Sequence, residues 1–375
     1  MKIAIVTKRF HTNLYFQVKA LKDAGHEVDL LVWSKGKSES YDILEPFVIG
    51  YAQFFTRLNS WLEKIPSKKM VNFLKFKLPF INLEEMIDYR RLKAKLKELK
   101  PDVALVRAYP GFSFLMMTLY ARRYSGKVFL LAQLNKHYGE TLRKKIYLFF
   151  LKKILRLQGI ITPLENILPQ KDKFFIYLPF VIAAPDFVKQ YFKNNRINVI
   201  SVGKFMERKE HLLLLRVINE LKNKYDLTLT IIGERVNETL FRQIEKFIKE
   251  NNLSDIVTVA SNLPHREVLQ KYRDFDLFVL PAHSEPAAYS PLEAMAAKLP
   301  VIVSDTCGTR GYIKEGENGY VFHSRSAEDL KNKMELIIGD REKFKRLGEA
   351  SFARVNKYYA PGVFVREFQR ILQIK

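Results

Sequence analysis

The sequence predicts an α/β protein made of two doubly wound domains, each a parallel sheet covered by helices on both faces. Short apolar runs of strand length alternate with amphipathic segments of helix length. This alternation starts near residue 3 and starts again near residue 197. The 375 residues are enough for two domains of ordinary size, and the hydrophobic content of 47% is enough to fill two cores.

The first block is expected to begin with a strand at Ile3–Val6 and a helix at Leu14–Ala24. Gly25 should end that helix, because glycine readily takes the left-handed conformation found at helix C-termini. A strand at Glu27–Trp33 follows. After a basic, aromatic-rich stretch at 51–100, the expected elements are a strand at 101–106, a helix at 112–124, a strand at 127–134 and a helix at 141–158.

The second block repeats this pattern more regularly. It should begin with the strand Ile197–Val202, which is followed at once by Gly203. The further expected elements are helix 211–222, strand 227–232, helix 238–250, strand 257–260, helix 266–275, strand 277–280, helix 291–297, strand 300–304 and helices at about 327–357 and 362–375.

The two blocks set the expected domain boundaries. We predict an N-terminal domain at 1–182, a linker at 183–196 and a C-terminal domain at 197–361. Pro185 supports the linker, because proline favours turns and interrupts regular structure. The last helix, at about 362–375, is a candidate to pack back on the N-terminal domain.

Cysteine content and apolar runs bear on the compartment. Cys307 is the only cysteine, so no disulfide can form within the chain, which fits a reducing compartment such as the cytoplasm. The N-terminal segment MKIAIVTKRF has the pattern of a first strand and not that of a signal peptide. Uncharged runs fall short of the roughly 18 residues that a membrane-spanning helix needs. We therefore expect no transmembrane segment.

The formal net charge of +23 makes nucleic acid, anionic lipid and phosphorylated small molecules candidate partners. The stretch 51–100 holds twelve basic residues against five acidic ones, and the stretch 141–158 holds six basic residues and no acidic one. Both stretches lie in the first half of the chain. A solvated basic face and a binding surface remain open alternatives.

The expected helix at 141–158 has two interpretations. Its basic residues group on one side and its apolar residues form a broad face: Lys145, Lys152, Lys153 and Arg156 against Leu142, Ile146, Phe150, Ile154 and Leu157. One interpretation is a helix packed on the core, and the other is a helix lying on an anionic membrane surface. The run 67–83, in which aromatic residues and lysines are interleaved, favours the membrane. We expect peripheral attachment of the N-terminal domain to the inner face of a membrane.

Several strand ends in the second block carry residues suited to a ligand, and ligands of doubly wound sheets bind at the carboxyl ends of strands. Gly203 lets the backbone approach a ligand closely. Lys204 and Lys209 can neutralise a diphosphate, although a basic turn before a helix is the ordinary alternative. Gly233 and the loop at 261–264 follow two further strands and could close over a flat base.

The most informative stretch is 284–305, SEPAAYSPLEAMAAKLPVIVSD. Glu285 and Glu293 bracket a short turn that leads into a helix, and Pro291 suits the first turn of that helix. Backbone N–H groups at a helix start bind phosphate, and a carboxylate can accept hydrogen bonds from both hydroxyls of a ribose. On spacing alone, two surface glutamates remain an alternative.

The context of this stretch resembles a known family. SEPAAYSPLEAMAAKLPVIVSDTCGTRGYI and the later GENGYVF resemble the retaining glycosyltransferases of family 4, also called glycosyl transferases group 1. VGKFMERKEHLLLL resembles the donor-phosphate segment of that family, and MKIAIVTKRF with DAGHEVDLLV resembles its N-terminal strand–helix–strand. The resemblance covers most of 197–322 and, more loosely, the whole chain. It implies the GT-B fold, in which two Rossmann-like domains face each other across a cleft.

The resemblance implies roles for individual residues. Glu293 would bind the ribose of a nucleotide diphosphate sugar, Glu285 would be a catalytic residue beside the donor sugar, and Lys204 and Lys209 would clamp the diphosphate. The other donor-binding positions it implies are Gly203, Gly233, Asn262, Leu263, Ala288, Tyr289, Ser290 and Pro291. Pro286 and Ala288 stand where the family commonly has glycine, which is tolerable only if their φ angles are negative.

For the first block, the resemblance implies an acceptor-binding domain. His137, in the loop after the strand 127–134, would contact the donor sugar as a catalytic residue. Arg107, at a strand end, and His11, in the first loop, would lie on the acceptor side. No cofactor and no metal site are expected, since the helix start, Lys204 and Lys209 would stabilise the leaving diphosphate.

We therefore expect a metal-independent, retaining transferase of the hexosyl type. It would move a sugar from a nucleotide sugar to a hydroxyl of a glycan or lipid-linked acceptor, in the synthesis of cell-surface polysaccharide, glycolipid or glycan. Two alternatives from other classes remain: a basic nucleic-acid-binding protein and a noncatalytic GT-B scaffold. The absence of a recognised nucleic-acid motif argues against the first, and the presence of both glutamates and both lysines argues against the second.

Overall fold

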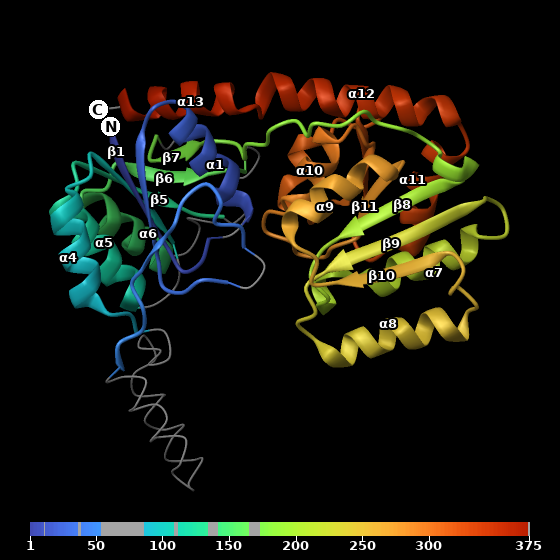
Figure 1. The fold of residues 1–375 in the computed structure, drawn as a ribbon, viewed down its shortest axis with the longest axis horizontal. Coiled ribbons are helices and arrows are strands. Elements are labelled where there is room, and N and C mark those ends of the chain that lie inside the picture. Colours follow the sequence, from blue (N-terminus) through green and yellow to red (C-terminus); the bar gives the residue numbers. More distant parts are fainter. Residues whose placement is uncertain are drawn as a thin grey trace, which may run out of the picture. The chain divides into compact units, whose positions relative to one another are not determined.

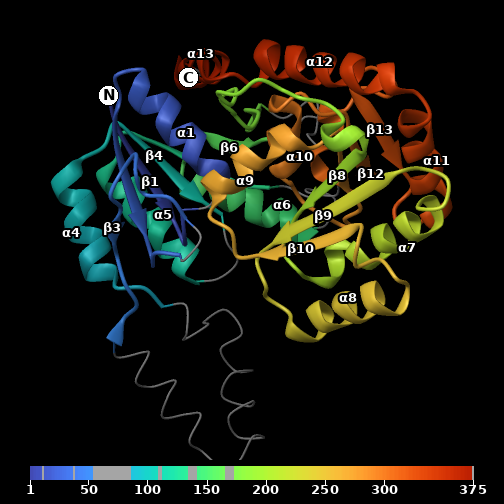
Figure 2. The same cartoon turned by 45° about the vertical axis from the view of Figure 1, so that its right-hand side comes forward.

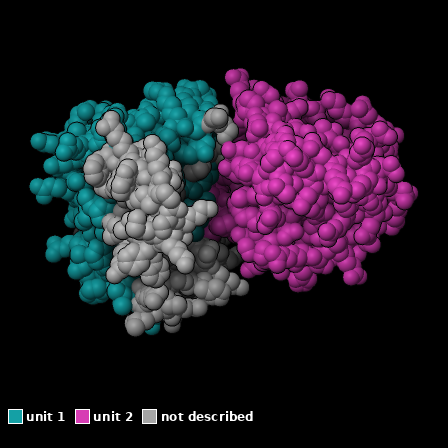
Figure 3. Space-filling view, turned by 90° about the horizontal axis from the view of Figure 1, so that it is seen from below, with its two compact units in different colours: residues 1–162, 167–178, 367–375 teal, residues 163–166, 179–366 magenta. Residues whose placement is uncertain are grey.

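A computed structural model of the protein describes residues 1–10, 12–36, 39–53, 86–108, 112–133, 142–164 and 173–373. The chain divides into two compact units (Figure 3). Unit 1 comprises residues 1–162, 167–178 and 367–375, and unit 2 comprises residues 163–166 and 179–366. Each unit is a parallel sheet with helices on both faces, so the predicted fold class of two doubly wound domains is confirmed (Figure 1).

The sheet of unit 1 has the strand order β3-β2-β1-β4-β5-β6-β7. Its strands are β1 (Lys2–Thr7), β2 (Glu27–Val32), β3 (Phe47–Val48), β4 (Val103–Arg107), β5 (Lys127–Leu131), β6 (Gly159–Thr162) and β7 (Phe175–Tyr177). All neighbouring strands pair in parallel. The nearly continuous apolar sequence of the central strands follows from burial on both faces.

The helices of unit 1 lie on the two faces of this sheet (Figure 2). They are α1 (Thr12–Asp23), α4 (Tyr89–Leu99), α5 (Phe112–Tyr124), α6 (Leu142–Phe149), the π-helical turn η2 (Phe150–Ile154) and the end of α13 (Pro361–Gln373). Gly25 ends α1 as predicted: it has a φ of +80°, and its N–H donates to the Lys22 carbonyl at 2.9 Å. The Lys127 ammonium donates to the Leu372 carbonyl, which ties α13 to this unit.

The sheet of unit 2 has the strand order β10-β9-β8-β11-β12-β13. Its strands are β8 (Ile197–Val202), β9 (Leu227–Gly233), β10 (Val257–Ser261), β11 (Leu277–Leu280), β12 (Val301–Ser304) and β13 (Gly319–Phe322). The order reverses at β8, which pairs with β9 on one side and β11 on the other. Such a reversal is the point at which doubly wound sheets bind ligands.

The helices of unit 2 are α7 (His211–Leu221), α8 (Glu238–Glu250), α9 (His265–Lys271), α10 (Ser290–Ala296), α11 (Ala327–Ile338) and α12 (Arg341–Tyr358). Short 3-10 turns are η4 (Lys193–Asn195), η5 (Glu207–Lys209), η6 (Tyr272–Asp274) and η7 (Gly308–Tyr312). Helices α7, α8 and α11 share one apolar core with the sheet, and α9 and α10 lie on the opposite face (Figures 1 and 2).

The prediction of the elements was incomplete in two ways. The helix predicted at 327–357 is two helices, because Asp340 caps the N-terminus of α12 by accepting from the Glu342 N–H at 3.1 Å. The strands β3, β6, β7 and β13 were not predicted, since runs of two to four residues are too short to show periodicity, and α4 lies in the stretch 51–100, to which no element was assigned.

The apolar face predicted for helix 141–158 was wrong at two positions. Ile146 and Ile154, assigned to that face, are exposed. Leu157, also assigned to it, is buried, as are Leu151 and Leu155, which were not assigned to it. The reason is the π-helical turn η2, in which the Leu155 N–H donates to the Phe150 carbonyl at 3.0 Å. This turn adds a residue to the helical repeat, so a projection at 3.6 residues per turn loses register.

Among the helices that the structure describes, none combines the length and apolar character needed to cross a membrane.

Candidate functional site

The carboxyl ends of β8, β9, β10, β11 and β12 meet at one edge of the unit 2 sheet, because all of these strands are parallel. Their register places Val202 opposite Ile232 and Ser261 opposite Gly233. The loops that follow these ends carry nearly all of the candidate residues of the second block. This edge of the sheet is therefore the candidate functional site.

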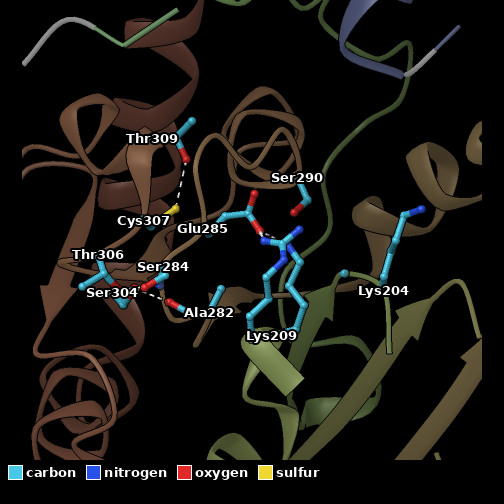
Figure 4. A network of polar contacts seen from close by, with 12 residues as sticks. Lys204, Lys209, Ala282, Ser284, Glu285, Ser290, Ser304, Thr306, Cys307 and Thr309 are labelled. Carbon is cyan, nitrogen blue, oxygen red and sulfur yellow. Dashed lines mark hydrogen bonds and ion pairs between the residues drawn. The ribbon is translucent and has the colours of Figure 1, made fainter. Parts of the chain in front are cut away.

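A buried carboxylate lies between two cations at this edge (Figure 4). The Glu285 Oε2 atom contacts the Lys209 Nζ atom at 2.7 Å and also accepts from the Arg208 guanidinium. Glu285 and Lys209 are both buried, whereas the Arg208 side chain is partly exposed. Burial alone would raise the pKa of the Glu285 carboxyl, but the charges and hydrogen bonds of Lys209 and Arg208 outweigh it and lower the pKa.

Gly203 makes room for Lys209. A Cβ atom on Gly203 would lie 3.2 Å from Lys209 Cδ and 3.3 Å from Cε, so a side chain there would press on the lysine stem. The Gly203 N–H donates to the Ile232 carbonyl at 2.9 Å and fixes the start of the loop. The glycine therefore lets the loop after β8 send Lys209 back toward Glu285.

The loop that carries Glu285 is held by residues at the end of β12 and after it (Figure 4). Ser304 donates to the Ala282 carbonyl, and the Ser284 N–H donates to the Thr306 hydroxyl at 3.1 Å. The Gly308 N–H donates to the Glu285 carbonyl at 2.8 Å. A Cβ on Gly308 would collide with the Pro286 carbonyl, so only glycine fits there. The backbone around Glu285 is thus fixed from a neighbouring strand.

Glu293 is the second buried carboxylate of the motif and is only 4% exposed. It lies in the first turn of α10. Its Oε1 atom is 2.6 Å from His265 Nε2, and its Oε2 atom accepts from the Tyr272 hydroxyl at 3.1 Å. A carboxylate has about four lone-pair positions, so these two partners leave room for about two more donors. Two hydroxyl groups of one ligand could fill that capacity.

The charge of Glu293 raises the pKa values of its two partners, His265 and Tyr272. Burial lowers the pKa of His265, but the Glu293 charge and hydrogen bond outweigh it, and the net shift is upward. Burial and the same carboxylate raise the pKa of Tyr272 well above its ordinary value. His265 therefore favours its charged form beside Glu293, and Tyr272 stays a neutral donor.

His211 contacts two backbone carbonyls of the loop after β8. Its Nε2 atom lies 3.2 Å from the Gly203 carbonyl and 3.3 Å from the Lys204 carbonyl. Burial, followed by the charge of Lys209, lowers the pKa of His211 to about 4. The imidazole is neutral at ordinary pH, and its Nε2–H can donate to these two carbonyls. His211 thereby fixes the backbone on which Lys204 sits.

The other predicted residues of the nearby loops are placed as follows. Lys204 is half-exposed and pairs with Glu234 at 2.6 Å, apart from the Glu285 cluster (Figure 4). A Cβ on Gly233 would lie 2.1 Å from the Gly203 carbonyl oxygen, so glycine is required for this close approach. The Asn262 side chain accepts from the Arg235 N–H at 3.1 Å, and Leu263 beside it is half-buried.

The start of α10 is tied to two other segments. Tyr289 is buried, and its hydroxyl donates to the Val181 carbonyl, so this side chain has a structural partner. Ser290 donates to the Val202 carbonyl at 2.9 Å and connects α10 to the end of β8. Pro291 lies in the first turn, as predicted, and Ala288 is buried.

The turn between the two glutamates adopts no strained backbone at Pro286 or Ala288. Neither residue is among those with positive φ, and the left-handed conformation in this loop occurs at Ser284, with a φ of +51°. Both residues that stand in place of glycine therefore avoid the positive φ angles that only glycine adopts easily.

In unit 1, Arg107 lies at the end of β4, and its guanidinium donates to the Asn13 side chain at 3.2 Å. His11, His137 and the run 67–83 lie outside the described residues. Among the residues that are described, no three His, Cys, Asp or Glu side chains are grouped closely enough to hold a metal ion.

Sequence reasoning missed His265 and Tyr272 as partners of Glu293, and His211 as a support of the donor loop. His265 immediately follows Pro264, at the end of the loop that was predicted to border the base. A titratable residue in a loop after a strand could have been recognised as a candidate site residue. Tyr272 lies within a predicted helix, and nothing in its spacing indicated a contact with α10.

Comparison with known proteins relates part of the chain to one family. Residues 184–354 match the family model of glycosyl transferases group 1. An uncharacterized glycosyltransferase of Methanocaldococcus jannaschii is 30% identical over 148 residues, which cover 40% of this chain and 40% of that protein. The chain thus spans well under half the length of this curated relative.

Solved structures match over the full length. A glycosyltransferase from Rickettsia africae has a TM-score of 0.73 at 13% identity, covering 100% of this chain and 99% of that one. The S. aureus TarM mutant, solved with UDP and α-GlcNAc-glycerol, has a TM-score of 0.70 at 13% identity and covers 100% of both chains. These likenesses establish the GT-B fold. The part of the chain that is similar to glycosyl transferases group 1, residues 184–354, lies within unit 2.

Proposed function

We propose that this protein is a retaining glycosyltransferase that uses a nucleotide diphosphate sugar as donor. One observation carries the proposal. Within the region that matches glycosyl transferases group 1, the edge of the unit 2 sheet holds two buried carboxylates. Glu293 has two hydrogen-bond partners and room for more, and Glu285 is paired with Lys209 and Arg208. The first suits a ribose diol and the second suits a diphosphate with its sugar.

Glu293 is the proposed ribose ligand. His265 and Tyr272 occupy one position on each oxygen, and the two ribose hydroxyls would take the remaining positions. Hydrogen bonds to a charged group contribute about 1.5–3 kcal/mol each. Since the carboxylate is already held by two partners, little side-chain freedom would be lost on binding.

Lys209, Arg208 and Lys204 are the proposed ligands of the diphosphate. In the free protein they are paired with Glu285 and Glu234. A diphosphate would compete for these cations, which leaves the Glu285 carboxylate freer to contact the donor sugar. If Lys209 and Arg208 bridge the carboxylate and the diphosphate, the buried Glu285 keeps a cation partner after binding.

The chemistry we propose is front-face displacement. The bond between the anomeric carbon and the diphosphate oxygen breaks, and a bond from that carbon to the acceptor oxygen forms on the same face. The acceptor proton passes to the leaving phosphate oxygen. Lys209 and Arg208 would stabilise the negative charge that develops there. Transfer would then need no metal, so activity should persist in EDTA.

Unit 1 is the proposed acceptor domain, with Arg107, His11 and His137 as the predicted contacts. The acceptor would be a hydroxyl of a glycan or lipid-linked sugar, transferred to in the cytoplasm during cell-surface polysaccharide, glycolipid or glycan synthesis. A hexose is the proposed sugar. NMR of the product's anomeric proton would show whether the donor configuration is retained.

A thermal-shift screen with UDP-, GDP- and ADP-sugars tests the donor site. One class should raise the melting temperature, because a ligand that binds the folded state stabilises it. Glu293→Gln and Lys204→Met should each reduce this shift and slow donor hydrolysis at least tenfold. Lys204 is half-exposed, so its loss should leave the stability of the free protein nearly unchanged.

Matched controls are available on helices away from this edge. Glu349→Gln on α12 and Lys331→Met on α11 remove an exposed carboxylate and a partly exposed ammonium group, and both variants should behave as wild type. The donor assignment would be wrong if no nucleotide sugar shifted the melting temperature, or if Glu293→Gln and Glu349→Gln had equal activity.

A further inference from the structure

Large apolar side chains are exposed on one continuous stretch of unit 1. Ile146 and Phe149 on α6 are 60% and 59% exposed, and Ile154 at the end of η2 is 61% exposed. A single exposed apolar residue is common on protein surfaces, but three within nine residues of one helical segment form a patch.

The inner side of this segment is already filled. Leu151 and Leu155 are buried in the core of unit 1, where Phe174 and Phe175 also lie. The exposed residues therefore cannot turn inward without displacing buried leucines. The packing of the buried leucines therefore keeps the patch on the outer side of the helix. The π-helical turn η2 determines which residues face outward.

The same surface is basic. Lys145 and Lys153 are exposed next to Ile146 and Ile154, and the exposed Arg156 follows them. No acidic residue occurs anywhere in the sequence from 141 to 164. We call Lys145, Ile146, Phe149, Lys153 and Ile154 the α6 face.

We infer that the α6 face lies on the surface of an anionic lipid bilayer. The isoleucines and the phenylalanine would enter the boundary between headgroups and acyl chains, and the lysines would meet lipid phosphates. This inference does not depend on the proposed transferase activity.

Charge and composition select the bilayer over other occupants. A second copy of the chain carries a net charge of +23 and would bring the same lysines face to face, which is repulsive. Nucleic acid would engage the lysines but would leave three apolar side chains in water. A surface with anionic headgroups above an apolar layer satisfies both kinds of residue.

Vesicle co-sedimentation tests the inference. The wild-type protein should bind vesicles of phosphatidylcholine with phosphatidylglycerol and bind pure phosphatidylcholine much more weakly. The triple variant Ile146→Asn/Phe149→Asn/Ile154→Asn should lose at least tenfold in partitioning. Lys145→Gln/Lys153→Gln should lose more than tenfold, since each basic residue near an anionic surface contributes about fivefold.

Val188→Asn is the control, because Val188 is an 85% exposed apolar residue of unit 2 and its replacement should change nothing. Each variant should also keep the wild-type circular dichroism spectrum and the wild-type response to nucleotide sugar, which separates this test from that of the donor site.

A labelling experiment gives an independent readout. Cys307, the only cysteine, is buried, so a thiol-reactive dye added to the Ile146→Cys variant should react only at position 146. An environment-sensitive dye there should shift to the blue on anionic vesicles, whereas the same dye on Val188→Cys should not. The inference is overturned if wild type does not bind anionic vesicles, if the triple variant binds like wild type, or if only RNA or self-association occupies the face.

Discussion

Acidification should destabilise unit 2 through His211. This imidazole is buried, and its pKa in the folded protein is lowered from 6.5 to about 4 by burial and by the charge of Lys209. Between these two values the unfolded chain binds a proton that the folded chain does not. Stability therefore rises with pH across this window and falls as the pH drops below about 6.5.

The magnitude follows from the two pKa values. Each pKa unit corresponds to about 1.4 kcal/mol, so the full difference amounts to roughly 3 kcal/mol. Most of it is reached early: by about pH 5, the linkage relation gives a loss of roughly 2 kcal/mol relative to about pH 8. That is a large part of the stability of an ordinary domain.

His211→Gln removes the titrating group but keeps an amide that can donate to the Gly203 and Lys204 carbonyls. Urea unfolding followed by far-UV circular dichroism should be measured at about pH 8 and pH 5. Wild type should lose roughly 2 kcal/mol more than the variant between these conditions. Tryptophan fluorescence is unsuitable, because Trp33 and Trp61 both precede residue 162 and do not report on unit 2.

His323→Gln is the control, since the His323 side chain is 83% exposed and its loss should leave the wild-type pH dependence intact. Equal acid sensitivity of wild type and His211→Gln would refute the reasoning. NMR titration of the His211 ring protons gives a second check on wild type alone: an apparent pKa near or above 6.5 would refute it as well.

Further predictions concern the same sheet edge. His265 has a raised pKa, so its ion pair with Glu293 stabilises the fold below about pH 6.5 and loses this contribution as the pH rises through the folded pKa; His265→Gln should therefore lower the melting temperature at about pH 6 more than at about pH 9. Gly233→Ala should cost roughly 1–3 kcal/mol in urea unfolding, because its Cβ would meet the Gly203 carbonyl. Gly362→Ala, with no atom near its Cβ, should cost nothing.

Periodicity predicted most of the fold because each strand of a doubly wound sheet is a short apolar run and each helix shows a spacing near 3.6 residues. The positions of Ile197–Val202 and Phe112–Tyr124 agree with β8 and α5. Periodicity failed at η2, where the number of residues per helical turn changes. A π-helical turn has no composition signal of its own, so the exposed positions of Ile146 and Ile154 could only be seen in the structure.

The two glutamates of the motif show where sequence reasoning reaches its limit in the site. Their spacing places Glu285 before α10 and Glu293 in its first turn, which was predictable from Pro291 alone. Their partners were not, because these come from segments distant in the chain: Lys209 follows β8, and His265 follows β10.

Strand order decides those partners. The order β10-β9-β8-β11 brings the loops after β8 and β10 to the same edge as the loop before α10. A different order of the same strands would have left both carboxylates buried without these partners, at a cost of several kcal/mol each. The compensation of Glu285 by cations and of Glu293 by His265 and Tyr272 is therefore a property of the topology, and the local sequence motif acquires its two distinct environments only once the sheet has formed.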